Sequence, residues 1–423
     1  MRTTFRLSTF GLLLAASAMP AGAQLKPGER PTELQIQAGE APATPIDESE
    51  KALRALQNSV ATTNWTRTAA GDLLAFVERI GEEGLDPADY QPDRLRAALD
   101  GIDEEQLRIA ATDTFLRVSS DLALGHARGD TRVDWHMVDT DLDGNQQYAL
   151  MRQAVENDSV EDTLRSLLPT HPQYAELKSV LSNTTDAATR NKIRTNLDRW
   201  RWLPRDLGPR YVIVNVPAFT VALVENGQVV TRHKAVVGAV KTATPQLSAV
   251  ATGVILNPWW EVPASIAPEV RGKKGYVKVD TGNGGVRYRQ PPGPGNALGR
   301  MKVVMPNNYA IYLHDTPSKA HFSRTARALS HGCIRTQDPL TFIRLLLDNP
   351  EWDKEAIDKA VAAGKTVKAE AVTPTPVYIA YFTAAAEANS GKILTYSDVY
   401  ARDSKVVAAL TDRSEKTALA SAD

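Results

Sequence analysis

The sequence contains only one cysteine, Cys333, among 423 residues. A single cysteine cannot form an intramolecular disulfide, so the fold does not depend on a disulfide framework. The side chain is then either a small buried apolar group or a reactive thiol. Its sequence neighbours, described below, favour the thiol.

Excess charge, metal-ligand spacing and long apolar runs are also missing. The formal net charge is −1, so there is no basic surface of the kind that binds nucleic acid. The seven histidines show no HExxH or comparable spacing, which argues against a zinc peptidase. After residue 23 no apolar run reaches the length of a membrane-spanning helix, so we expect no transmembrane segment in the mature chain.

One acidic segment begins like a calcium-binding loop. Asp139, Asp141 and Asp143 occupy positions one, three and five, and Gly144 occupies position six. Position twelve is Leu150 instead of the bidentate glutamate that such loops use. We therefore predict no calcium site here.

The first 23 residues have the features of a secretory signal peptide. Arg2 and Arg6 precede an apolar run over residues 7–19, and Ala-Gly-Ala at 21–23 supplies a small-residue cleavage site. Residues 24–44 are poor in apolar side chains and are predicted to form a flexible leader. The sequence thus predicts an exported protein.

Residues 45–181 carry the apolar spacing of helices. Helices are expected over 72–80, 93–99, 104–124 and 164–181, the last with interruptions. A linker rich in Thr, Asn, Asp and Ala follows over 182–192, and another helix is expected over 193–203. The sequence therefore predicts a helical N-terminal domain.

After residue 204 the pattern becomes that of short β-branched strands. Strands are expected over 211–216, 220–225, 228–232, 234–238, 250–256, 310–313 and 376–382, with a helix over 340–347. Asn226-Gly227 is a strong hairpin signal between the second and third of these strands. The predicted fold class is α+β, with a mostly antiparallel domain over 193–411 and a flexible tail over 412–423.

The strand pattern breaks down between residues 257 and 299. This segment is punctuated by glycine and proline and opens with Trp259 and Trp260. A long excursion of this kind inside a compact domain is usually functional. We predict a functional loop inserted into this domain.

The cysteine lies in the sequence Ser-His-Gly-Cys-Ile-Arg over residues 330–335. Gly332 allows a tight turn whose N–H groups face a ligand. His331 and Arg335 place hydrogen-bond donors or positive charge beside Cys333, which would favour the thiolate. The thiolate is the form that attacks carbonyl carbon.

A second histidine, His314, lies 19 residues before the cysteine in Ile-Tyr-Leu-His-Asp-Thr-Pro, residues 311–317. That spacing suits a strand, a connecting excursion and a return to the same place. The two motifs together resemble the L,D-transpeptidases of the YkuD type, and in particular their large Gram-negative branch. That branch carries a helical scaffold domain, which residues 121–129 and 167–174 also resemble.

The resemblance implies a scaffold domain over 45–181 and a catalytic domain over 193–411, with a substrate-capping loop over 257–299. Many relatives carry a small peptidoglycan-binding module between the two domains. Here only residues 182–192 separate them, so this module is missing from the expected place.

The resemblance also implies a mechanism. The Cys333 thiolate attacks a peptidoglycan tetrapeptide stem, releases D-Ala and forms a thioester. A second stem amine then attacks the thioester and gives a 3–3 cross-link. His314 is the expected base, oriented by a main-chain carbonyl, and the N–H groups of Gly332 and Cys333 are expected to bind the oxyanion. No metal or organic cofactor is needed, and carbapenems are expected to acylate Cys333.

Five other residues are assigned to the site, each with its alternatives. Arg335 is predicted to bind a substrate carboxylate, or else to form an internal salt bridge. His331 either supports the thiolate or bonds the loop backbone. Tyr312 either lines the acyl pocket or packs in the core. Trp259 and Trp260 are predicted to shape the groove under the capping loop, with core packing as the alternative for Trp260.

Other functions remain open from the sequence. With water as the acceptor the protein would be a carboxypeptidase or hydrolase, and with an envelope protein it would be a protein-to-wall ligase. A non-catalytic wall-binding scaffold is the alternative from another class. The expected location is the periplasm, and the expected partners are stem peptides and possible wall-synthesis enzymes.

Overall fold

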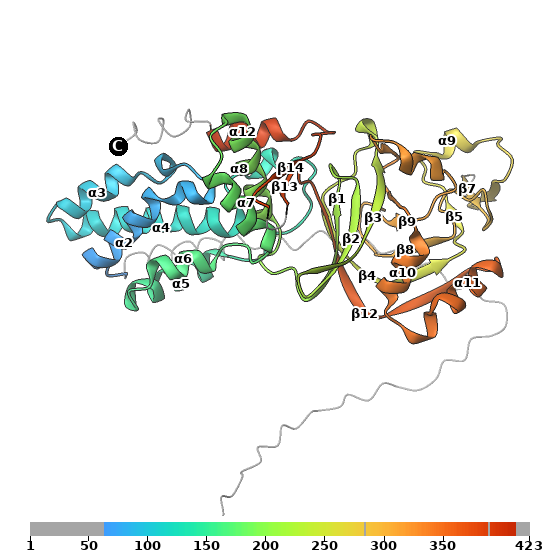
Figure 1. Ribbon diagram of the computed structural model, residues 1–423, viewed down its shortest axis with the longest axis horizontal. Coiled ribbons are helices and arrows are strands. Elements are labelled where there is room, and N and C mark those ends of the chain that lie inside the picture. Colours follow the sequence, from blue (N-terminus) through green and yellow to red (C-terminus); the bar gives the residue numbers. More distant parts are fainter. Residues whose placement is uncertain (1–62, 283–284, 388–389, 412–423) are drawn as a thin grey trace, which may run out of the picture. The chain divides into compact units, whose positions relative to one another are not determined.

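The structure is a computed structural model that describes residues 63–282, 285–387 and 390–411 (Figure 1). The signal peptide predicted over 1–23, the leader over 24–44 and the tail over 412–423 lie outside the described residues. Among the residues described, no helix is both long and apolar enough to cross a membrane.

The first part of the described chain is helical, as predicted. Its α-helices are α2 (Arg67–Glu78), α3 (Pro92–Asp100), α4 (Glu104–Leu124), α5 (Gly144–Glu156), α6 (Val160–Ser166), α7 (Pro172–Ser182) and α8 (Ala187–Trp202). Short 3-10 helices lie between them: η1 (Ile80–Glu83), η2 (Pro87–Tyr90) and η3 (Gly129–Thr131).

Local caps explain where the longest helix of this part begins and ends. The side chain of Asp103 accepts hydrogen bonds from the N–H groups of Glu105 and Gln106 and so starts α4. Gly125 ends it with a φ of 82°, and a Cβ there would lie 2.6 Å from the Trp202 ring. The buried face of α4, with Leu107, Phe115 and Leu122 among others, forms the centre of the helical core.

The link between α7 and α8 is shorter than the sequence suggested. Helix α8 begins at Ala187, six residues before the expected start at 193, because the Asp186 side chain accepts from the N–H of Thr189. Only residues 183–186 connect the two helices. The composition of residues 182–192 suggested a linker, whereas Asp186 within it is a typical N-cap residue and marks the start of a helix.

The second part is built on a mostly antiparallel sheet. Its strands are β1 (Arg210–Asn215), β2 (Thr220–Glu225), β3 (Gln228–Gly238), β4 (Leu247–Leu256), β8 (Met301–Val304), β9 (Leu313–His314), β10 (Ala328–Ser330), β11 (Ile334–Thr336) and β12 (Val367–Ala380). The strand order is β10-β3-β11-β9-β8-β4-β12-β1-β2, and β2 also pairs with β3. The sheet therefore closes on itself, which leaves β10 as a side branch. Three pairings are parallel: β1 with β12, β10 with β3 and β11 with β9.

Three strand predictions differ from the structure, and the strand expected over 376–382 is the end of the longer strand β12 (Val367–Ala380). Segments 228–232 and 234–238 form one continuous strand, β3, because no turn residue separates them. The strand expected over 310–313 is reduced to Leu313–His314, because Ala310 adopts a left-handed backbone with φ 53°. The predicted Asn226-Gly227 hairpin is confirmed, with φ values of 48° and 76°.

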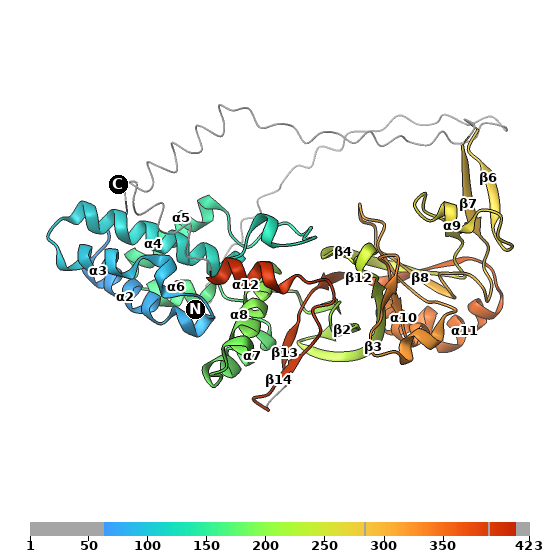
Figure 2. The same ribbon diagram turned by 90° about the horizontal axis from the view of Figure 1, so that it is seen from above.

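The inserted segment 257–299 has more regular structure than expected. It contains β5 (Trp260–Glu261), α9 (Ala267–Val270), β6 (Val277–Asp280) and β7 (Val286–Gln290). The three strands form a separate sheet in the order β5-β7-β6. Figure 2 shows the β6/β7 ribbon projecting from the main sheet beside α9.

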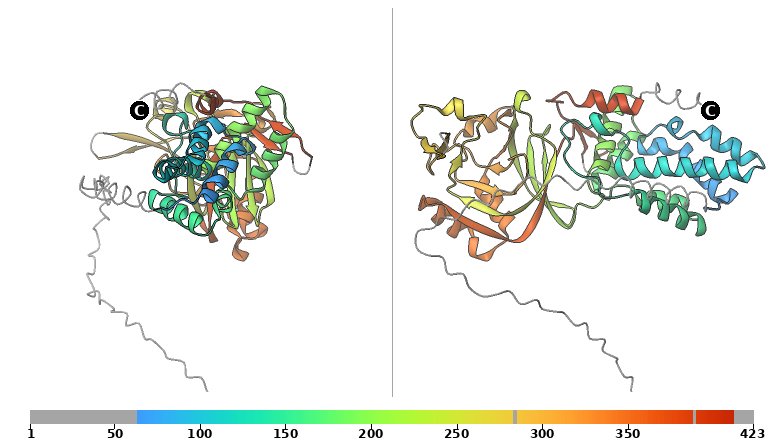
Figure 3. Two further views of the ribbon diagram at one scale, coloured as in Figure 1. Left: turned by 90° about the vertical axis from the view of Figure 1, so that its left-hand side faces the viewer. Right: turned by 180° about the vertical axis from the view of Figure 1, so that it is seen from behind.

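Helices cover part of the main sheet and the chain then returns to the helical part. Helices α10 (Pro339–Leu347) and α11 (Lys354–Ala362) supply Phe342, Leu346 and Ile357 to the core of the sheet. Three short 3-10 helices also belong to this part: η4 (Val240–Thr242), η5 (Lys319–Ser323) and η6 (Pro350–Trp352). After β13 (Ala384–Ala386) and β14 (Ile393–Thr395), helix α12 (Asp403–Thr411) packs beside α8 (Figure 3). All the described residues belong to one compact unit.

Candidate active site

A cavity of about 460 Å³ opens between the inserted segment and the motif around the cysteine. Its lining combines residues of the inserted segment, the loop before β9 and the 330–335 turn. Six of the residues singled out in the sequence line it: Trp260, Tyr312, His314, His331, Cys333 and Arg335. The cavity therefore gathers most of the predicted site in one place.

Strand pairing brings the two motifs together. Strand β11 runs parallel to β9 with Ile334 opposite Leu313 and Arg335 opposite His314. Between the two motifs the chain passes through η5 and β10 before it returns. This is the strand, excursion and return that the spacing predicted.

His314 is buried and held in one tautomer. Its Nδ1–H donates to the main-chain oxygen of Asp315 at 2.5 Å, which leaves Nε2 as an acceptor. Burial, with a further contribution from the charge of Arg335, lowers the pKa of His314 to about 3. The imidazole is therefore neutral at neutral pH and can accept a proton.

The carbonyl that orients His314 belongs to a residue that is itself firmly held. Asp315 is buried, and its carboxylate accepts from the N–H of Arg300 at 2.9 Å and pairs with Lys319. Burial alone would raise the pKa of Asp315, but the bonds from Lys319 and Arg300 outweigh it and keep that pKa below its usual value. Gly299 packs against this carboxylate, since a Cβ there would lie 2.5 Å from its atoms.

Cys333 carries a thiol rather than the thiolate that its neighbours suggested. Burial raises the pKa of Cys333, and the N–H and phenol of Tyr312, with Lys302 and Arg335, only partly oppose this. The Sγ atom lies 3.6 Å from the main-chain oxygen of Ala310, an acceptor that suits a protonated thiol. The sequence neighbours predicted the charge of Arg335 but neither the charge of Lys302 nor the burial of the thiol.

Lys302 is a cation at the site that the sequence analysis missed. It lies on β8 opposite His314, and its Nζ is 4.0 Å from the centroid of the Tyr312 ring. Burial lowers the pKa of Lys302, and the charge of Cys333 opposes that shift. Its position on the strand face shared with His314 is visible only once β8 and β9 are paired.

Arg335 lines the cavity without an acidic partner among the residues that the structure describes. Its Nη1 lies 3.3 Å from Nδ1 of His321, and its buried Nε has no hydrogen-bond partner. Arginine favours bidentate binding of carboxylates. The unsatisfied Nε therefore favours substrate binding over the internal salt bridge.

Hydroxyl groups hold the turn that contains Cys333, residues 330–333, which we call the cysteine turn. Gly332 has a φ of 114°, and its N–H donates to Oγ of Ser330 at 3.1 Å. Ser330 in turn donates to the carbonyl of Cys333 at 2.6 Å, and Thr244 donates to the carbonyl of Gly332 at 2.7 Å. Of the two amides predicted to bind an oxyanion, that of Gly332 is thus engaged within the turn in this structure.

Of the remaining predicted residues, His331 and Trp260 line the cavity and Trp259 lies elsewhere on the inserted segment. His331 is exposed, and its Nε2 lies 3.2 Å from Glu269 of α9, so it connects the turn to the inserted segment. Trp260 lines the cavity beside Tyr312, where burial raises the pKa of the phenol and the indole partly opposes that shift. Trp259 instead stacks under Arg289 at 3.9 Å and does not line the cavity.

The acidic segment that resembled a calcium loop is used structurally. Asp139 bonds Arg132 at 2.9 Å, and the carboxylate of Asp141 accepts from the N–H of Arg205. Asp143 forms a capping box at the start of α5. These contacts account for the three carboxylates.

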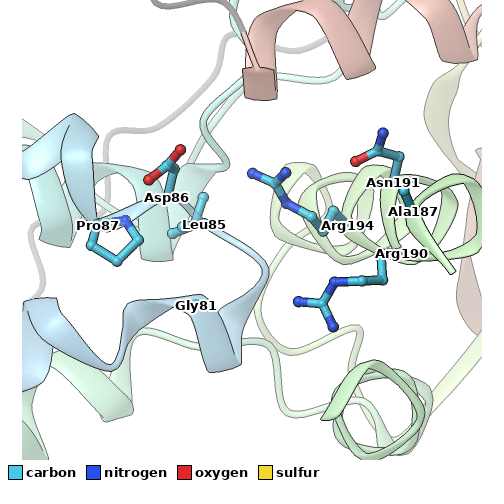
Figure 4. A pocket seen from close by; sticks show the side chains of 8 residues that line it. All are labelled: Gly81, Leu85, Asp86, Pro87, Ala187, Arg190, Asn191 and Arg194. Atoms are coloured by element: carbon cyan, nitrogen blue, oxygen red, sulfur yellow. The ribbon is translucent and has the colours of Figure 1, made fainter. Parts of the chain in front are cut away.

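A second cavity, of about 320 Å³, lies far along the chain from the cysteine motif and holds two arginines from α8 (Figure 4). Figure 4 shows Arg190 and Arg194 on the side of the cavity opposite Asp86 and Pro87. Both guanidinium groups already bond main-chain carbonyls, Arg190 that of Thr184 at 2.8 Å and Arg194 that of Gly84 at 2.6 Å. These bonds tie α8 to its neighbours, and the cavity contains no candidate nucleophile among its described lining residues.

Comparisons with known proteins agree with the geometry. The family model described as the L,D-transpeptidase catalytic domain (YkuD) matches residues 209–379. A model described as a scaffold domain matches residues 52–181.

Individual relatives are more distant. A Haemophilus influenzae protein named "Putative L,D-transpeptidase" is 27% identical over 284 residues, which cover 60% of this chain and 57% of that protein. The NMR structure of the catalytic domain of the Enterococcus faecium L,D-transpeptidase, acylated by ertapenem, is 14% identical, with a TM-score of 0.23, and the match covers 41% of this chain and 98% of that one. An L,D-transpeptidase from Mycobacterium smegmatis is 14% identical with a TM-score of 0.22, over 40% of this chain and 58% of that one. The chain therefore contains an L,D-transpeptidase catalytic domain of the YkuD family over residues 209–379, and a match to the scaffold domain precedes it.

Proposed function

We propose that this protein is a periplasmic L,D-transpeptidase that forms a thioester between Cys333 and a peptidoglycan tetrapeptide stem. The reaction releases D-Ala, and the acyl group then passes to a second stem amine to give a 3–3 cross-link. The observation that carries the proposal is the cavity shared by Cys333 and a neutral His314 oriented through the Asp315 carbonyl. The signal-peptide pattern over residues 1–23 supports the periplasmic location.

The resting site holds two uncharged groups, so proton transfer must accompany bond formation. Burial raises the pKa of Cys333 and lowers the pKa of His314 to about 3, so a separated thiolate–imidazolium pair is unfavourable before substrate binds. Nε2 of His314 takes the thiol proton as Sγ attacks the carbonyl, and then gives it to the departing amine of D-Ala. In the second half-reaction the same nitrogen takes a proton from the attacking amine.

Negative charge that develops on the carbonyl oxygen needs donors that are already in place. The Cys333 N–H and the Tyr312 phenol are the proposed donors, because the N–H of Gly332 already bonds Ser330. Lys302, held over the Tyr312 ring, adds positive charge behind the phenol. No metal or organic cofactor enters this scheme.

The test is intact-mass analysis of the mature protein incubated with a disaccharide-tetrapeptide, with Cys333→Ala as the control. Loss of D-Ala with formation of a dimer of two stems, absent from the control, is the expected result. Free tripeptide without dimer would instead indicate a hydrolase, or an acceptor protein left out of the mixture. An unmodified protein and intact tetrapeptide would contradict the proposal and favour a non-catalytic wall-binding role. A mass shift with a carbapenem, lost in the control, is expected as well.

Replacing Arg335 with glutamine is expected to raise the KM for the tetrapeptide about 10- to 100-fold, because a charge-assisted hydrogen bond to a substrate carboxylate contributes about 1.5–3 kcal/mol. Arg335→Lys should recover only part of this, since an ammonium cannot bind bidentately. Steady-state release of D-Ala measures the effect.

Arg324→Gln, at an exposed position between η5 and β10, is the matched control. It should leave the KM unchanged. An Arg335→Gln variant with the wild-type KM would show that Arg335 does not bind the carboxylate.

A further inference from the structure

A segment of the helical part reaches the main sheet beside the start of β4. The main-chain N–H of His136 donates to the oxygen of Gln246 at 2.8 Å, and the N–H of Gln246 donates to the oxygen of Asp134 at 2.8 Å. The Gln246 side chain also donates to the oxygen of Val133 at 2.9 Å. Residues 133–136 are therefore bonded to the residue directly before β4 of the catalytic sheet.

The same segment is anchored firmly on its other side. The Trp135 and Trp202 rings pack edge to face at 5.4 Å, and the Arg132 guanidinium lies 5.1 Å from the Trp202 ring centroid. Arg402 pairs with the carboxylate of Asp134. The backbone that carries His136 is thus held by aromatic and ionic contacts to α8 and to the turn before α12.

From this anchored backbone the His136 ring stacks on Tyr309. The two ring centroids are 4.2 Å apart and the planes are inclined by 24°. Tyr309 lines the catalytic cavity, yet 45% of its surface is exposed, so without the histidine it would have little to hold its ring. The next residue, Ala310, has the left-handed φ of 53° and offers its carbonyl to Cys333 Sγ at 3.6 Å.

We propose that His136 is a positioning residue supplied by the helical domain, which holds Tyr309 as a wall of the substrate cavity and so sets the affinity for the stem substrate. The inference rests on the proposed function for the identity of the substrate. It assigns the helical domain a direct part in the active site, through residues that lie more than 170 positions apart in the sequence.

The test compares His136→Ala and His136→Phe by the kcat and KM for D-Ala release and by the rate of Cys333 alkylation with iodoacetamide. His136→Ala should raise the KM about 3- to 10-fold, the range that corresponds to loss of one aromatic stack. The kcat and the alkylation rate should stay within about twofold of wild type, because neither His314 nor the thiol is touched. His136→Phe should restore the KM, since its ring can stack without a hydrogen bond.

His171→Ala is the matched control, because His171 makes a similar stack on Trp200, at 4.2 Å and 18°, away from the catalytic cavity. It should lower thermal stability, as it also removes the N-cap of α7, and leave the KM unchanged. An unchanged KM in His136→Ala, or a KM in His136→Phe as high as that in His136→Ala, would overturn the proposal. A His136→Ala variant in which kcat and the alkylation rate fall by equal factors would also overturn it. A wild-type protein that alkylates but releases no D-Ala would instead contradict the proposed function.

Discussion

Replacing His314 with glutamine is expected to lower the rate of Cys333 acylation by the tetrapeptide about 10²- to 10⁴-fold, the usual contribution of a general base. Glutamine is close in size and keeps a hydrogen-bonding side chain near the Asp315 carbonyl, but it cannot take the thiol proton. Because burial raises the pKa of Cys333, almost no thiolate is available at neutral pH to compensate. Rapid-quench intact-mass analysis of the acyl-enzyme measures the loss.

The pH dependence of the reaction shows whether His314 acts as a base or only holds the structure. The pKa of His314 is lowered to about 3, so the wild-type imidazole is protonated, and acylation lost, only as the pH falls toward that value. At high pH the thiol of the variant ionises directly, so alkylation by iodoacetamide should rise toward the wild-type rate. The His314→Gln variant should therefore fail at pH 7 and recover part of its reactivity in alkali.

His321→Gln is the matched control for this experiment. His321 lies beside Arg335 but has no contact with the thiol among those described. It should acylate within a few-fold of wild type. A His314→Gln rate above a tenth of the wild-type value would exclude His314 as the base.

Replacing Gly238 with alanine is expected to lower the free energy of unfolding by about 3 kcal/mol, the upper end of the usual cost of overpacking, because the atoms that the added Cβ meets are backbone. A Cβ at this position would lie 2.1 Å from the oxygen of Thr242 and 2.7 Å from the nitrogen of Thr244. The N–H of Gly238 donates to the Thr244 hydroxyl, which itself donates to the carbonyl of Gly332. Any shift that relieves the clash therefore moves the cysteine turn, and we expect acylation to fall as well.

Urea denaturation followed by circular dichroism measures the stability change. Gly71→Ala is the control, because Gly71 lies inside α2 and a Cβ added there would have no neighbouring atom within 4 Å. It should raise the free energy of unfolding by about 0.5–1 kcal/mol, since alanine is the better helix former. Equal denaturation midpoints for Gly238→Ala and wild type would show that the backbone around Thr242 adapts freely.

Much of the fold follows from local patterns. The helical part, the Asn226-Gly227 hairpin and the helix at 339–347 correspond to periodicity and turn signals that lie within a few residues of one another. The errors have local causes too. An N-cap at Asp186 begins α8 early, and a left-handed Ala310 shortens β9.

The inserted segment was harder to predict for a different reason. Its strands β6 and β7 have exposed and half-exposed side chains, so they lack the alternation by which half-buried strands are recognised. Their pairing, not their burial, makes them a sheet. Contacts such as that of Glu269 with His331 then follow from the position of this segment over the cysteine turn.

The sequence by itself determined the residue types of the site, because the two motifs and their spacing already contain Cys333, His314 and Arg335. Only the tertiary structure decided their chemical state. A pKa depends on burial and on charges that distant strands supply, and here burial keeps both the thiol and the imidazole neutral. The same holds for Lys302 and His136, whose places at the site come from strand pairing and from the packing of the helical part on the sheet. No local pattern encodes those contacts, because the partners are brought together only when the whole chain folds.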